Sequence, residues 1–200
     1  MFIVFEGGEG CGKSTQARRL YQYFLDQGKK VILTREPGGT KNAEALRYLV
    51  VSDQYEEWPI KAEFLLMLAA RIDHYEKLIK PHLEQDYIVI CDRFMLSTLA
   101  YQGYGRGLDV SWMRHIHDEI LNDLKIDKTF VLLLPPENAL TRVEKPQRFE
   151  ALGLAFHQRV YTGFKDLSHG LDVINVEGKD VDKVFDAIVE KLNDTVSVTL

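Results

Sequence analysis

The chain has 200 residues, 46% of them hydrophobic and 28% charged, so it can bury the core of one domain and is not wholly disordered. Its 25 Lys and Arg residues against 30 Asp and Glu residues give a net charge of -5. This acidic balance excludes a protein whose main partner is duplex DNA or an anionic membrane.

Short β-rich runs alternate with longer helical stretches along the chain, and four of the five runs are nearly continuously apolar, as in strands covered on both faces. This alternation predicts right-handed crossovers and one α/β domain over residues 1–200, with a parallel five-stranded sheet between helices in three layers. In chain order, the predicted elements are strand Phe2–Glu6, helix Lys13–Leu25, strand Val31–Arg35, helix Ile60–Leu83, strand Tyr87–Asp92, helix Val110–Leu124, strand Thr129–Leu134, strand Val173–Val176 and helix Val181–Leu192.

The chain has no recognisable targeting or membrane signal. Its first residues lack the basic region and long apolar stretch of a secretory signal. The longest uninterrupted apolar run, Phe64–Ala70, is far shorter than the roughly 20 residues that span a bilayer. Two cysteines, Cys11 and Cys91, do not make a secreted-type disulfide framework. We therefore expect a cytoplasmic protein.

Polar or glycine-rich residues follow three of the predicted strands. They are Glu6-Gly7, the stretch from Arg35 to Gly39, and Asp92-Arg93. Ligands of parallel α/β sheets bind at the carboxyl ends of the strands. We expect the functional site where these three strand ends meet.

Residues 7–14 read Gly-Gly-Glu-Gly-Cys-Gly-Lys-Ser and fit the phosphate-loop pattern G-x-x-x-x-G-K-[ST], directly after a strand and opening a helix. Glycines let backbone N–H groups turn toward phosphate oxygens, Lys13 can reach the β- and γ-phosphates, and the Ser14 hydroxyl can ligate Mg²⁺. The alternative is a glycine-rich turn that happens to precede a lysine. The predicted ATP-binding residues are Gly7, Gly8, Glu9, Gly10, Cys11, Gly12, Lys13, Ser14 and Thr15.

The chain lacks the sequence signatures of other phosphate-loop protein classes. The Asn-Lys-x-Asp element by which GTPases read their base does not occur. Asp92 is followed by Arg93-Phe94-Met95, so no Asp-x-x-Gly follows the third strand, and no Ser-Gly-Gly-Gln is present. Phosphate transfer to a small molecule is favoured by elimination.

Arg35 and Arg93 stand at the ends of neighbouring predicted strands, close to the phosphate loop. The planar fork of arginine suits a phosphate group. A lone arginine at a strand end is at least as often an ion-pair partner, but two beside a phosphate loop favour a second anion site. Asp92 occupies the position of the acidic residue that acts near Mg²⁺ in phosphate-loop enzymes.

Several stretches together resemble bacterial thymidylate kinase, a P-loop nucleoside monophosphate kinase family. They are Phe5-Glu6-Gly7 before the loop, Thr34 through Thr40 with the sequence Thr-Arg-Glu-Pro-Gly-Gly-Thr, and Asp92-Arg93 followed by Ser97 and Ala100-Tyr101-Gln102-Gly103. The resemblance runs from residue 2 to about residue 192. It implies a P-loop NTPase fold, transfer of the ATP γ-phosphoryl group to dTMP giving dTDP and ADP in dTTP biosynthesis, Mg²⁺ as cofactor with ATP as co-substrate, and a homodimer packed through the helix that holds Phe64–Ala70.

The resemblance also assigns residues to the acceptor. Glu9 would lie near the sugar 3′-hydroxyl, Arg35 and Arg93 would hold the phosphate, and Arg71 would hydrogen-bond the thymine edge. Ser97 and Gln102 would line the base pocket, and Tyr101 would pack under the deoxyribose. The implied dTMP-binding residues are Glu9, Arg35, Met67, Arg71, Arg93, Ser97, Tyr101 and Gln102.

The sequence departs from the family at two positions. Met67 replaces the usual Phe that stacks on thymine; a thioether can still pack on a ring face. Gly10 occupies the position at which one branch of the family carries an arginine in the phosphate loop.

The other branch of the family supplies a catalytic arginine from a lid over ATP, and the stretch from Arg142 to Glu150 fits a short lid. Arg148 is the first choice for the cation on the transferring phosphoryl group, and Arg142, which would contact ATP, is the second. The alternative is a solvated charged loop. The predicted catalytic residues are Lys13, Arg93, Arg148, Glu9 and Asp92, and the predicted metal ligands are Ser14 and Asp92.

Two other functions remain open from the sequence. The chain could be a different phosphate-loop kinase that acts on a deoxynucleoside or another monophosphate, although a nucleoside would bring no phosphate for Arg35 and Arg93. It could also be a nucleotide-binding regulatory module without turnover. The stretch Gly103–Gly107 is either a loop over the acceptor, with Arg106 assisting, or a plain connection before the next helix.

Overall fold

In the part of the chain that the structure describes, five parallel strands form one sheet in the order β2-β3-β1-β4-β5. The computed structural model describes residues 1–52, 54–142 and 148–196. The strands are β1 (Phe2–Gly7), β2 (Val31–Arg35), β3 (Ile88–Asp92), β4 (Lys128–Leu133) and β5 (Asp172–Asn175). All five predicted strands are therefore confirmed, with ends displaced by at most one residue.

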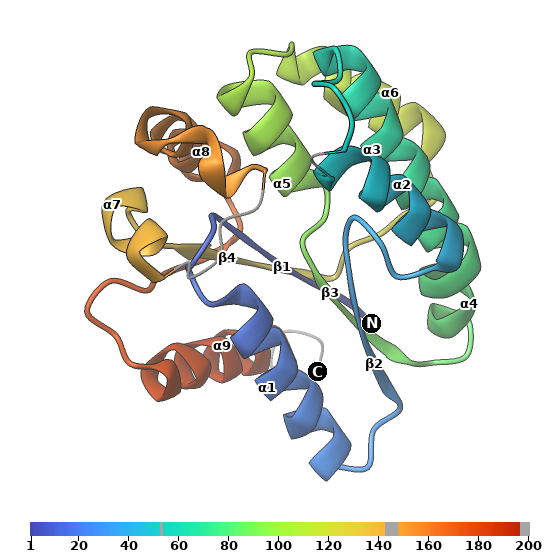
Figure 1. Cartoon of the computed structure of the whole chain (residues 1–200). Coiled ribbons are helices and arrows are strands. Elements are labelled where there is room, and N and C mark those ends of the chain that lie inside the picture. Colours follow the sequence, from blue (N-terminus) through green and yellow to red (C-terminus); the bar gives the residue numbers. More distant parts are fainter. Residues whose placement is uncertain (53, 143–147, 197–200) are drawn as a thin grey trace.

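Helices connect the strands and cover both faces of the sheet (Figure 1). They are α1 (Lys13–Asp26), α2 (Lys41–Val51), α3 (Ile60–His74), the π-helical η1 (Tyr75–Ile79), α4 (Lys80–Leu83), α5 (Met95–Thr98), the π-helical η2 (Leu99–Gly105), α6 (Val110–Ile120), α7 (Pro136–Ala139), the 3₁₀ turns η3 (Leu140–Arg142) and η4 (Glu150–Leu152), α8 (Leu154–Leu167) and α9 (Val181–Val196). The predicted helix over 60–83 is α3, η1 and α4 placed end to end, and the one predicted to reach residue 124 ends at Ile120.

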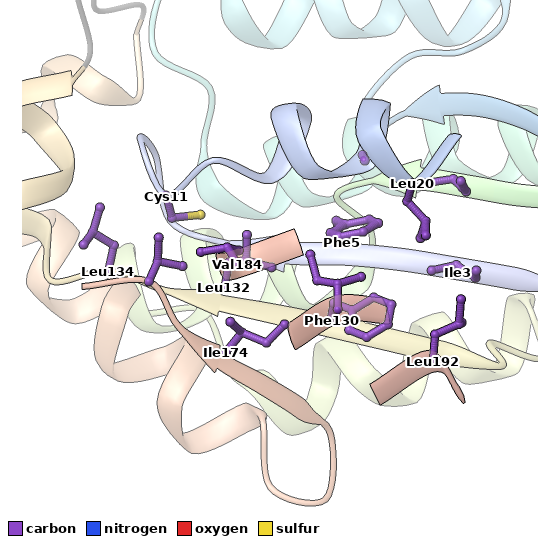
Figure 2. Close-up of a cluster of buried hydrophobic side chains, with 14 of the residues drawn as sticks. Ile3, Phe5, Cys11, Leu20, Phe130, Leu132, Leu134, Ile174, Val184 and Leu192 are labelled. Atoms are coloured by element: carbon purple, nitrogen blue, oxygen red, sulfur yellow. The ribbon is translucent and has the colours of Figure 1, made fainter. Parts of the chain in front are cut away.

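The central strand β1 is buried on both sides, and its side chains alternate between two hydrophobic clusters. Ile3 and Phe5 pack with residues of α1 and α9, as Figure 2 shows. Phe2 and Val4 face the opposite way, into a cluster with α3, η1 and α6. Because each face of the strand meets its own helical layer, the strand reads as an uninterrupted apolar run in the sequence.

The register of the strands brings the predicted functional residues to one edge of the sheet. Phe5 of β1 pairs with Asp92 of β3, and Asp92 in turn pairs with Arg35 of β2. The phosphate loop leaves β1 directly after these pairs. The three strand ends therefore meet, as the sequence predicts. Among the described residues, no helix combines the length and apolarity needed to cross a membrane.

Candidate active site

The phosphate loop connects β1 to α1 and is held by its own lysine. Gly12 precedes the helix with φ 94°, in the left-handed region. The Lys13 ammonium donates to the carbonyl oxygen of Gly8 at 2.5 Å, and the lysine is 5% exposed. The loop thus folds around a buried cation at a helix N-terminus, an arrangement that attracts phosphate.

Two glycines let this loop lie close to neighbouring backbone. A Cβ on Gly7 would stand 2.2 Å from the carbonyl oxygen of Leu132, and one on Gly10 would stand 2.1 Å from that of Ala139. Both have positive φ, 139° and 67°. The loop conformation therefore requires glycine at position 10, where one branch of the family carries an arginine.

The carboxylate of Asp92 lies beside Ser14 at the start of α1. The Ser14 hydroxyl donates to Asp92 Oδ2, while Asp92 Oδ1 is buried without a partner among the described residues. A hydroxyl and a carboxylate are oxygen ligands of the kind Mg²⁺ prefers. The described residues contain no group of three or more His, Cys, Asp or Glu residues that could hold a metal. Ser14 and Asp92 fit a Mg²⁺ ion whose other ligands would be phosphate oxygens and water.

A cavity opens beside the phosphate loop, between α2, α3 and the α5–η2 segment. We call it the acceptor cavity. It contains seven of the eight residues predicted to bind the acceptor. Its lining residues are Glu9, Glu36, Pro37, Arg47, Val51, Met67, Arg71, Arg93, Phe94, Ser97, Thr98, Tyr101, Gln102, Arg148 and Phe149.

Glu9, Arg93 and Tyr101 form one cluster in the acceptor cavity. Arg93 Nη2 lies 2.7 Å from Glu9 Oε1, to which the Tyr101 hydroxyl also donates at 2.9 Å. The Arg93 guanidinium stands over the Tyr101 ring at 5.3 Å. Burial alone would raise the pKa of Glu9, but the charges of Arg93 and Lys13, together with hydrogen bonds from Tyr101 and Arg93, outweigh it and lower that pKa to about 2. Glu9 is therefore an anion that helps to fix the cation beside it.

Arg93 has an unusual backbone conformation for a non-glycine residue, with φ 73°. The side chain is held there by the Gly7 carbonyl at 3.0 Å and the Ser97 hydroxyl at 3.1 Å. Ser97 donates in turn to the fully buried Glu6 at 2.5 Å, and burial raises the pKa of that carboxyl above its ordinary value. These contacts hold Arg93 in a strained backbone conformation. Such strain is typical of a functional site.

Arg71 reaches the acceptor cavity from α3 and is fixed by neighbouring polar groups. It is 3% exposed, and its Nε donates to Glu36 at 2.7 Å and its Nη2 to Thr98 at 2.8 Å. The other oxygen of Glu36 lies 3.0 Å from Nδ1 of the buried His74. The guanidinium is thereby held in one orientation at the cavity wall, as a set of hydrogen-bond donors.

Glu63 is fully buried in α3, behind the same cavity. Its carboxylate accepts from Gln102 Nε2 at 2.9 Å and from Arg106 Nη1 at 2.6 Å, and it lies 2.9 Å from Arg148 Nη2. Arg148 also donates to the carbonyl oxygen of Val50 at 2.6 Å. In this structure Arg148 is thus bonded to α2 and α3 at the acceptor cavity.

Three other predicted residues lie elsewhere. Arg35 lines a neighbouring groove with Ser14 and Asp92, pairs with Glu44 at 3.2 Å and keeps 57% of its side chain exposed. Arg142 and Thr15 are exposed. The predicted lid over 142–150 falls partly on residues 143–147, which lie outside the described residues. The segment Gly103–Gly107 is not an open loop, because η2 extends to Gly105 and Arg106 bonds Glu63.

Several lining residues were not predicted from the sequence. Glu36 was recognised only as part of the Arg-Glu-Pro-Gly-Gly-Thr stretch, and a carboxylate between a strand-end arginine and a glycine-rich turn could have signalled a partner for a cation. Arg47, which donates to the Pro37 carbonyl at 3.2 Å, lies on a helix that the periodicity did not reveal. Phe94 and Thr98 follow Arg93 so closely that their side chains could have been included with it.

Three comparisons with known proteins agree with one another. A sequence model of the family described as thymidylate kinase matches residues 5–188. Thymidylate kinase of Caulobacter vibrioides is 42% identical over 198 residues, covering 98% of this chain and 95% of that protein. That of Geotalea daltonii is 40% identical over 209 residues, with 96% and 98% covered. The crystal structure of thymidylate kinase from Ehrlichia chaffeensis superposes with a TM-score of 0.77 at 36% identity, covering 96% of this chain and 98% of that one.

Proposed function

The chain belongs to the thymidylate kinase family, and from that premise we propose that it transfers the γ-phosphoryl group of ATP to dTMP, giving dTDP and ADP, with Mg²⁺ as cofactor. One observation carries the proposal. The acceptor cavity meets the phosphate loop at Glu9 and Arg93, so an acceptor bound in the cavity presents its phosphate beside the donor site.

The donor side supplies charge and orientation. Backbone N–H groups of the loop and the Lys13 ammonium would hold the β- and γ-phosphates of ATP. Mg²⁺, when bound, neutralises charge on these phosphates. Ser14 would ligate it, and Asp92, whose Oδ1 has no partner among the described residues, would hold the ion or its water shell.

Different residues of the acceptor cavity would bind the phosphate and the base. Arg93 would bind the acceptor phosphate, and Glu9 and Tyr101 would flank the sugar. At the other end, Arg71 presents donors that suit the O4 acceptor of thymine. Met67 lines the wall at which a ring face would pack, and a polarizable thioether packs well on an aromatic ring.

Catalysis in this proposal rests on positioning and electrostatics, with no covalent enzyme intermediate. Lys13 and Arg93 would hold the two mutually repelling phosphates close to each other. Arg148 remains the first candidate for an additional cation on the transferring group, and Arg142 the second. Such cations contribute most where negative charge develops in the transition state.

We also propose a homodimer that packs through α3. Phe64 and Leu68 of this helix are buried in the core, while Leu65 is 51% exposed, which leaves apolar surface for a second copy. Sedimentation of wild type and of Leu65→Glu tests this: a dimer that the variant weakens is expected, and a wild-type monomer would contradict it.

The two free, buried cysteines support a reducing, cytoplasmic location.

A coupled ADP-release assay tests the proposed function. The purified protein is supplied with MgATP and, in turn, dTMP, dUMP, dCMP, other nucleoside monophosphates and thymidine. The proposal expects dTMP to give the highest kcat/KM. A preference for thymidine would indicate a nucleoside kinase, and a lack of ADP with every acceptor would favour a regulatory module.

A further inference from the structure

The buried carboxylate of Glu63 fixes the orientation of the Gln102 amide at the acceptor cavity. An ionised carboxylate only accepts hydrogen bonds, whereas a glutamine amide has a donating and an accepting end. Gln102 Nε2 lies 2.9 Å from Glu63 Oε1, so the donating end is turned toward Glu63. The accepting end, Gln102 Oε1, is buried and has no partner among the described residues.

Two arginines contact the other oxygen of the Glu63 carboxylate. Arg106 lies 2.6 Å and Arg148 2.9 Å from Glu63 Oε2, so one oxygen faces two guanidinium groups while the other faces the amide of Gln102. Glu63 itself is fully buried and does not line the cavity. It therefore acts on a ligand only through Gln102 and Arg148, which do line it.

Arg71 and Gln102 both line the cavity, Arg71 with hydrogen-bond donors and Gln102 with an acceptor oxygen that has no partner among the described residues. A thymine edge offers the reverse pattern, an O4 acceptor beside an N3–H donor. Cytosine carries a donating amino group at C4 and an accepting N3. Resting on the proposed function, we propose that Glu63 is a specificity-determining positioning residue: by fixing the Gln102 amide it favours an acceptor base with an N3–H over one with an unprotonated N3.

The test compares kcat/KM for dTMP and for dCMP in Glu63→Gln, which keeps the shape but lets either end of Gln102 turn toward residue 63. The ratio of the two values is expected to fall at least about tenfold, the usual effect of one mismatched hydrogen bond in a buried site. The KM for ATP is expected to stay within about twofold. Glu57→Gln is the matched control, because Glu57 pairs with the same Arg106 but is 71% exposed, and it should keep the wild-type ratio.

A second variant distinguishes an effect of the Gln102 amide from an effect of the two arginines. It does not depend on whether Glu63→Gln folds. Gln102→Leu removes the acceptor and leaves Glu63 with Arg106 and Arg148, so the ratio should fall in this variant as well. In that background Glu63→Gln should change the ratio no further. An effect carried by Arg106 or Arg148 would instead persist in the double variant.

Three results would overturn the inference: a folded Glu63→Gln protein with the wild-type ratio, a Gln102→Leu protein with that ratio, or a further fall in the double variant. Thermal unfolding of each variant shows which proteins are folded. If the wild-type protein phosphorylates dTMP and the ratio resists these substitutions, only the inference fails. If the wild-type protein does not phosphorylate dTMP, the proposed function fails and the inference fails with it.

Discussion

Arg93 Nη2 lies 2.7 Å from Glu9 Oε1, so the cation that faces the acceptor cavity is paired before any phosphate arrives. The pair joins the phosphate loop to the end of β3 and keeps the long arginine side chain in one conformation. A preorganised cation costs less conformational entropy when it binds its ligand. The same pair makes Glu9 unusually acidic, which has a measurable consequence for stability.

The first prediction concerns acid stability. Because the pKa of Glu9 falls from 4.5 to about 2 on folding, its stabilising contribution is present above pH 4.5 and is lost as the pH falls toward 2. The free energy of unfolding of wild type should therefore decline more steeply over this range than that of Glu9→Gln, by at most about 1.4 kcal/mol per pH unit. Urea unfolding at several pH values measures both slopes. Glu119→Gln, at an exposed carboxylate on α6, is the control, and parallel curves for wild type and Glu9→Gln would refute the assignment.

The second prediction ranks the two strand-end arginines. Arg93→Ala should lower kcat/KM for dTMP by about 100-fold or more, because it removes a preorganised cation from the acceptor cavity. Arg93→Lys should lie between wild type and Arg93→Ala, since a lysine keeps the charge but loses the fork. Arg35→Ala should cost less, because Arg35 pairs with Glu44 in the neighbouring groove and is largely exposed. Steady-state kinetics at saturating MgATP give the ranking, and an Arg35→Ala loss that exceeds the Arg93→Ala loss would reverse it.

The third prediction concerns the base. Met67→Phe should preserve or improve dTMP binding, because a flat ring stacks on thymine over a larger area than a thioether does. Isothermal titration with dTMP measures the dissociation constant directly. A large loss of affinity would mean that the cavity is built differently around Met67.

The fourth prediction concerns Arg148. Arg148 lines the acceptor cavity and is proposed to place a cation on the transferring phosphoryl group. Because such a cation contributes most where negative charge develops in the transition state, Arg148→Ala should reduce turnover by more than a few-fold. Turnover at saturating dTMP and MgATP is the measurement. A rate within a few-fold of wild type would remove Arg148 from the catalytic residues. Arg142→Ala then tests the second candidate.

The strands and the phosphate loop could be predicted from the sequence because local patterns determine them. A strand buried on both faces is a short apolar run, and the loop needs glycines at fixed spacing before Lys13. The meeting of the three strand ends could be predicted from the parallel topology of the sheet alone. These features together placed Glu9, Arg93 and Asp92 at one edge of the sheet.

The remaining helices depend on contacts that a sequence does not display. Helix α8 carries Gly163 in its interior, which costs about 1 kcal/mol relative to alanine and argues locally against a helix. In the structure a Cβ at this position would stand 2.7 Å from the ring of Tyr104, so close packing against η2 requires the glycine. Helix α2 buries fully only Ala43 and Val50, too few to give a clear helical period.

Pairs of polar residues that lie far apart in the sequence could not be predicted either. Glu63 and Gln102 are 39 residues apart, and each reads locally as an ordinary polar residue of a helix. Only packing of α3 against η2 brings them together. The sequence therefore predicted which residues line the acceptor cavity better than it predicted which residues orient them.

Transfer of labelled phosphate tests the central claim most directly. The purified protein is incubated with Mg²⁺ and ATP labelled in the γ-phosphate, with and without dTMP, and the labelled products are separated by chromatography. The label should move to dTDP only when dTMP is present, and a chelator of Mg²⁺ should stop the transfer. Label that appears as free phosphate regardless of dTMP, or no transfer at all, would contradict the proposal that the acceptor cavity and the phosphate loop form one kinase site.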